Sequence, residues 1–88
     1  MLSTTSQPDA ILLANRALAR LNLGKVNDAI ADSELAIEAD GNYVKGYWRL
    51  GQAYTALGDH KKSLKAFEDG LKVEPGNKAL VKEADKAR

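Results

Sequence analysis

The sequence predicts an all-α fold, an α-solenoid built from two helix-turn-helix repeats and a C-terminal capping helix. The 88 residues are rich in Ala, Leu, Lys and Glu, which favour helices, and include only two prolines. Small and apolar residues recur with a period of 34 residues. A glycine divides each repeat into two helical stretches. The identities at this period are Ala19 with Ala53, Leu23 with Leu57, Gly24 with Gly58 and Glu34 with Glu68.

The first repeat is expected to contain helices at about 8–22 and 26–39. Pro8 and Asp9 suit the start of a helix, because proline needs no N–H partner there and the carboxylate complements the helix dipole. Gly24 lies between the two stretches and supplies the left-handed conformation that ends a helix. These signals predict a helical hairpin.

The second repeat is expected to contain helices at about 43–57 and 60–73. Gly58 occupies the turn position that Gly24 occupies in the first repeat, and Pro75 prevents the last of these helices from continuing. The same hairpin is therefore predicted twice, in adjacent parts of the chain.

The remaining segments complete the predicted domain organisation. Asn77 is a favourable N-cap, and the apolar positions after it follow helical spacing, so a final amphipathic helix is expected to cover Phe67 and Leu71. The expected segments are a disordered tail at 1–7 and one domain at 8–88, made of repeat one at about 8–41, repeat two at about 42–75 and the capping helix at about 77–88.

The composition argues against several classes of function. The chain has no cysteine, which removes disulfides and thiolate chemistry and favours an intracellular location. His60 is the only histidine and has no second metal ligand at a suitable spacing, so neither a metal nor another cofactor is expected. With no phosphate-binding loop and no Ser-His-Asp set, we do not expect an enzyme. The longest apolar run, near 11–14, is far shorter than the ~20 residues of a membrane span, so a soluble cytoplasmic protein is expected.

Charge is distributed unevenly along the chain. Residues 1–44 contain three basic and six acidic residues, whereas residues 45–88 contain ten and six, which gives the second half a net charge of +4. A basic stripe follows the last helix: Lys78, Lys82, Lys86 and Arg88. Acidic residues interleave with it, so a solubilising surface is favoured over nucleic-acid binding. The helix-spaced pair Asp28 and Asp32 is likewise expected to face solvent.

Three polar residues form the candidate binding site. In a helical-repeat array the first helix of each repeat lines the concave surface, so Asn15 and Arg49, separated by one repeat period, are expected to be neighbours. Lys45 precedes Arg49 by one helical turn on the same stripe, and such like-charge pairs cost about 0.2–0.5 kcal/mol. This arrangement indicates a ligand that supplies carboxylates, although a solvated helix face is the alternative. Trp48 and Gln52 flank the stripe and are expected groove contacts; packing is the alternative for Trp48.

The second repeat carries a motif with fixed spacing: Tyr47-x-x-Leu50-Gly51-x-x-Tyr54, then Ser63-x-x-x-Phe67, then Pro75. This spacing resembles a tetratricopeptide repeat (TPR), a helix-turn-helix unit with the period seen in this chain. Proteins of this kind act mainly as adaptor surfaces. The resemblance therefore implies a protein-protein interaction module.

A second resemblance concerns the candidate site. The segment around Asn15, together with the later segment Lys45-Gly46-Tyr47-Trp48-Arg49, is similar to the second and third repeats of a Hsp-organising-protein-like domain of the dicarboxylate-clamp co-chaperone type. In that family, the matching Asn, Lys and Arg grip the terminal Asp of chaperone tails ending Glu-Glu-Val-Asp. The resemblance implies that the partners are tails of cytosolic heat-shock chaperones of the seventy or ninety kilodalton class.

Two expectations qualify this function. The family's clamp uses a further Lys and Asn on an earlier repeat, for which this chain has no counterpart, so weak affinity for such tails is expected. The alternative is a structural scaffold or a homo-oligomer that associates through an uncapped N-terminal face, because terminal repeats normally need a polar outer surface. A membrane or nucleic-acid partner is not expected.

Overall fold

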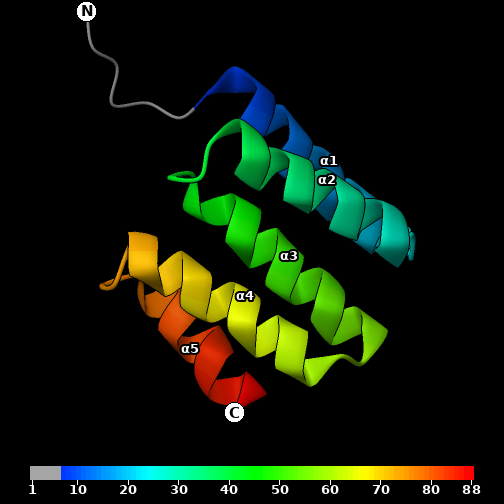
Figure 1. The fold of residues 1–88 in the computed structure, drawn as a ribbon. Helices are drawn as coiled ribbons and strands as arrows, with labels where there is room; N and C mark the ends of the chain where they lie inside the picture. Colours follow the sequence, from blue (N-terminus) through cyan, green and yellow to red (C-terminus); the bar gives the residue numbers. More distant parts are fainter. Residues whose placement is uncertain (1–6) are drawn as a thin grey trace, which may run out of the picture.

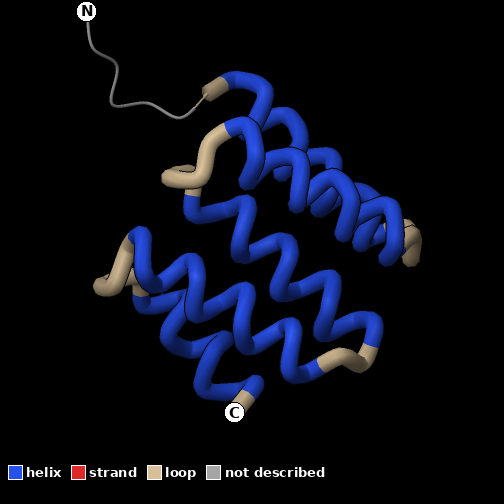
Figure 2. Tube along the Cα trace, in the orientation of Figure 1, coloured by secondary structure: helices blue, strands red, loops and turns tan. Residues whose placement is uncertain are grey.

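The computed structural model describes residues 7–88, which form five α-helices and, within that range, no strand (Figures 1 and 2). The helices are α1 (Pro8–Asn22), α2 (Val26–Ala39), α3 (Val44–Leu57), α4 (His60–Val73) and α5 (Lys78–Ala87). Every expected helix is present, with ends that differ by at most one position from the prediction, and the all-α repeat architecture is confirmed. The disordered tail predicted at 1–7 lies outside the described residues except for Gln7.

The helices are stacked in chain order, with α1 and α5 at opposite ends of the stack (Figure 1). Each helix packs against the next, and α1 also packs against α3. The first helices of the two repeats are therefore neighbours, as the repeat period predicted. None of the helices in the described range combines the length and apolar character that crossing a bilayer requires.

Local sequence explains where the helices begin and end. Gly24 and Gly58 have φ angles of 79° and 87°, the left-handed conformation that glycine adopts without steric cost. The side chains of Asp59 and Asn77 each accept a backbone N–H bond from the first turn of α4 and α5, respectively. The tight turns and the start of the last two helices thus follow from single residues.

The core consists of two apolar clusters. One cluster lies between α1, α2 and α3 and is built on fully buried alanines, which lets these helices approach closely: Ala17, Ala29 and Ala53. In the second repeat Phe67 is the largest buried residue, and α5 covers it with Leu80 and Ala84. Leu71 packs against the same cluster. The capping role predicted for the last helix is therefore confirmed.

Gly51 is expected to be the least tolerant glycine of the chain. A Cβ atom at this buried position of α3 would overlap the ring of Phe67, which α5 holds in place. Because overpacking typically costs about 1–3 kcal/mol, Gly51→Ala should lower the free energy of unfolding in urea by about that amount. Gly76→Ala is the matched control, since its Cβ meets nothing within 4 Å. Equal unfolding midpoints for the two variants would contradict this close packing.

Candidate functional site

Asn15 and Lys45 are both exposed on the first helices of their repeats. Asn15 lies in the middle of α1, and Lys45 lies in the first turn of α3. None of the six ion pairs formed among residues 7–88 involves Lys45 or Arg49. The charge of Lys45 is therefore not neutralised by an acidic side chain of the described chain.

Arg49 is half-buried and held in a fixed position by its neighbours. Its Nη1 donates a hydrogen bond to Oε1 of Gln52 at 3.0 Å, and its guanidinium carbon lies 5.1 Å from the centre of the Trp48 ring. Its Nε is buried and finds no acceptor among residues 7–88. Burial lowers the pKa of the Arg49 guanidinium below its ordinary value, while the charge of Tyr43 acts in the opposite direction and raises it. Since arginine is not deprotonated in proteins, the group remains a cation.

The two expected groove residues beside Arg49 differ in their roles. Gln52 is half-buried and orients the guanidinium, which leaves Nη2 of Arg49 without a hydrogen bond to any described residue. Trp48 packs against the core cluster around Phe67, and its Nε1 is buried without an acceptor in residues 7–88. Trp48 also lines a surface pocket, so it contributes both to packing and to the surface beside Lys45.

That pocket opens between the start of α3 and the loop before α5, and its volume is about 330 Å³. Lys45 and Trp48 line one side, and Glu74 and Asn77 line another. Oε1 of Glu74 accepts a hydrogen bond from Nδ2 of Asn77 at 2.9 Å rather than pairing with Lys45. The pocket therefore presents Lys45, a cation without an ion pair among residues 7–88, and the carboxylate of Glu74, which already accepts a hydrogen bond from Asn77.

The register of the two repeats relates the three predicted ligand-binding residues. Asn15 and Arg49 occupy equivalent positions of the two repeats, on α1 and α3, which pack against each other. Lys45 lies one helical turn before Arg49. That all three donors converge on one ligand stays a prediction.

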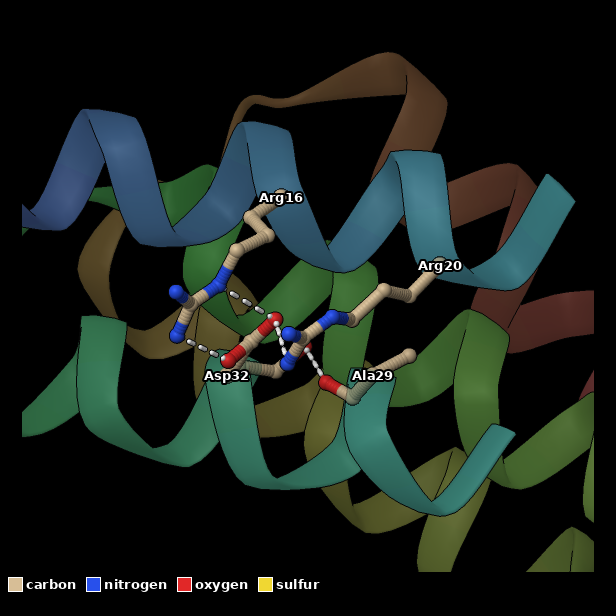
Figure 3. Close-up of polar contacts among 5 residues, drawn as sticks. Arg16, Arg20, Ala29 and Asp32 are labelled. Carbon is tan, nitrogen blue, oxygen red and sulfur yellow. Dashed lines mark hydrogen bonds and ion pairs between the residues drawn. The ribbon is translucent and has the colours of Figure 1, made fainter. Parts of the chain in front are cut away.

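Sequence reasoning missed an ion cluster around the buried Asp32 (Figure 3). The Asp32 side chain is only 2% exposed, so its predicted solvent-facing position is wrong. Arg16 donates to both of its oxygens, from Nη2 to Oδ1 at 2.8 Å and from Nε to Oδ2 at 3.0 Å. Arg20 donates from Nη1 to Oδ2 at 3.0 Å. Asp32 is buried because it shares the inward face of α2 with Ala29 and Ala36, which pack toward the neighbouring helices.

This cluster ties α1 to α2 next to the candidate site. Arg16 follows Asn15 directly, and its bidentate contact with Asp32 fixes the rotation of α1 against α2. The hydrogen bond to Asp32, and then its charge, raise the pKa of the Arg16 guanidinium. The signal in the sequence was the spacing of Arg16 and Arg20, which are one turn apart on one helix face. Among residues 7–88, no three His, Cys, Asp or Glu side chains gather as a metal site would require.

Two curated relatives match this chain over most of its length. It is 39% identical over 70 residues to the Hsp70-Hsp90 organizing protein of Triticum aestivum and 44% identical over 73 residues to serine/threonine-protein phosphatase T of Aspergillus oryzae. These matches cover 80% and 82% of this chain but only 12% and 15% of the relatives. The phosphatase is matched through its repeat region alone.

A solved structure provides a closer comparison of the fold. The second TPR domain of human RPAP3, determined in complex with the HSP70 peptide SGPTIEEVD, is 43% identical and superposes with a TM-score of 0.84. The match covers 90% of this chain and 66% of that one. Tetratricopeptide repeat models match residues 10–43 and residues 44–77. The chain therefore belongs to the tetratricopeptide repeat family.

Proposed function

We propose that this chain is a co-chaperone-type interaction module that binds the acidic C-terminal tails of heat-shock chaperones, of the kind that end in Glu-Glu-Val-Asp. The observation that supports it most is Lys45, which forms no ion pair within residues 7–88, beside the half-buried, oriented Arg49. A TPR domain of 43% identity was determined with an HSP70 peptide of this ending, and the name of the wheat relative couples Hsp70 with Hsp90.

The chemistry of the three donors suits a tail of this kind. A terminal aspartate carries two carboxylates, the main-chain one and the side-chain one, close together. Arg49 offers Nη2 for a charge-assisted hydrogen bond, and Lys45 adds a mobile ammonium with three donors. Asn15 adds a neutral amide donor from the neighbouring helix. Because Gln52 and Trp48 already restrain Arg49, little side-chain entropy remains to be lost when the tail binds.

We propose the same residues as the site and assign the module no catalytic activity. The phosphatase relative shares only the repeat region with this chain, which supports a binding role. The proposed ligands belong to cytosolic chaperones, so the proposed location is the cytoplasm. We also propose that residues 8–88 form one domain, since α5 shares the core cluster of the second repeat.

A calorimetric titration tests this function with the peptide SGPTIEEVD as a free acid and as its C-terminal amide. Amidation removes one of the two terminal carboxylates and therefore one charge-assisted interaction, which is worth about 1.5–3 kcal/mol. The free acid is expected to bind about 10–100 times more tightly than the amide. Raising the salt concentration should weaken binding of the free acid.

A third peptide, in which Asn replaces the terminal Asp, isolates the contribution of the side-chain carboxylate. It is expected to bind more weakly than the free acid and to keep part of the affinity through the main-chain carboxylate. If all three peptides bind equally, or if none binds, the proposed function is wrong.

A further inference from the structure

An apolar groove lies between α1 and α2. These two helices form the end of the stack opposite α5 (Figure 1). Leu12 is 67% exposed and Leu35 is 47% exposed, and Leu13 also lines the groove. Asp9 and Glu38 provide the charged part of the groove, and no basic residue of the described range 7–88 lines it. An apolar surface bordered by charges of one sign is a typical docking surface.

Comparing the first repeat with the second indicates what kind of structure fits this groove. Leu12 of the first repeat is equivalent to Gly46 of the second, and Gly46 lies where α3 packs against α2. A Cβ atom at Gly46 would stand 3.1 Å from Cγ1 of Ile37 on α2. The same side of α1 thus corresponds to a helix-packing side of α3, and a helix is the shape that fits it.

The opposite end of the stack presents a helix of complementary character. On α5, Leu80 and Ala84 face the core, whereas Lys78, Val81 and Lys82 are exposed. These three lie on one stripe, because residues three and four apart are neighbours on a helix. Val81 is 40% exposed, and neither lysine forms an ion pair within residues 7–88.

We propose that α5 of a second copy of this chain docks in the α1–α2 groove, so that copies associate head to tail. Val81 then covers the groove leucines, and Lys78 and Lys82 meet Asp9 and Glu38. The net charges of the two halves, −3 (3 basic against 6 acidic residues in 1–44) and +4 (10 against 6 in 45–88), favour this orientation. Two copies joined groove to groove would place acids against acids.

The geometry of this contact determines the kind of assembly. Because the two surfaces are different, each copy keeps one free groove and one free α5, so the interface is heterologous and leads to open chains of copies. A single short helix buries less surface than a stable interface requires, so the association is weak and depends on concentration. Neither surface includes Asn15, Lys45 or Arg49, so self-association and tail binding are tested with different variants.

Sedimentation equilibrium between 10 µM and 1 mM tests the proposal by exchanging charges. The wild-type chain is expected to show an average mass that rises with concentration. Variant A (Asp9→Lys with Glu38→Lys) and variant B (Lys78→Glu with Lys82→Glu) should each stay monomeric. In each variant the groove and the exposed side of α5 carry charges of the same sign and repel each other. An equimolar mixture of A and B, and a chain carrying all four substitutions, should associate again.

The control variant is Lys25→Glu with Lys61→Glu. It changes the net charge by the same amount as variant B, but neither residue belongs to the groove or to α5. It should associate like the wild type, and circular dichroism should show unchanged helix content for every variant. A wild-type chain that is monomeric at 1 mM overturns the proposal. Association of variant B equal to that of the wild type also overturns it, as does failure of the folded A and B variants to associate when mixed.

Discussion

Replacing Lys45 and Arg49 together by glutamate is expected to reduce affinity for a free-acid SGPTIEEVD peptide by at least about 100-fold. The substitution removes two cations from the proposed site and places two carboxylates against those of the tail. Losing one partner of a desolvated charge pair costs about 2–5 kcal/mol, and each 1.4 kcal/mol is a factor of ten in affinity. Calorimetry with the wild-type chain and the variant measures the difference.

Lys45 and Arg49 differ in burial, so their variants need different controls. Lys45 is exposed, so Lys45→Glu alone should weaken binding without changing the unfolding midpoint. Arg49 is half-buried against Trp48, so its variant needs a check of helix content by circular dichroism. The pair Lys25→Glu with Lys61→Glu changes the net charge by the same amount away from the site and should keep affinity. Wild-type affinity in the Lys45 and Arg49 double variant would show that these residues are not the anchors.

Asp32→Ala is expected to destabilise the fold by about 2–3 kcal/mol. Removing one member of a buried ion cluster costs about 3–5 kcal/mol when the remaining charges stay buried. Arg16 and Arg20 keep 50% and 34% of their side-chain surface exposed and can regain water, which places the effect below that range. Urea unfolding followed by circular dichroism measures the loss, which is large for a domain whose total stability is about 5–15 kcal/mol.

Asp28→Ala is the matched control, because Asp28 lies one turn earlier on α2 and is exposed. It should change the free energy of unfolding by less than about 0.5 kcal/mol. If Asp28→Ala and Asp32→Ala destabilised the fold equally, the ion cluster around Asp32 would make no contribution of its own to stability. A drop in peptide affinity beyond the unfolded fraction would in addition assign Arg16 a role in positioning Asn15.

Much of the fold could be predicted from the chain because its signals are local. The turns at Gly24 and Gly58 depend on the conformational freedom of single residues, and the start of α5 depends on the Asn77 side chain and the N–H groups next to it. The cover over Phe67 followed from helical spacing in the last segment. The repeat period in turn predicted that α1 and α3 are neighbours.

The candidate site was predicted only in part. The register indicated Asn15, Lys45 and Arg49 by position, and the structure adds that Lys45 lacks an acidic partner in the described chain, while Gln52 restrains Arg49. Those facts depend on which side chains surround the site. The surroundings of Lys45 and Arg49 are therefore set by how neighbouring helices pack, which the period of the sequence does not predict.

The sequence by itself determined the number of helices, their ends, the turns between them and the repeat that orders them, because each depends on residues close together in the chain. Only the tertiary structure decided that Asp32 is buried between two arginines and that Leu12 is left exposed. The rotation of α2 about its axis directs Asp32 toward α1 rather than toward water. A rotation of this kind is set by packing summed over several helices, which no short stretch of sequence specifies.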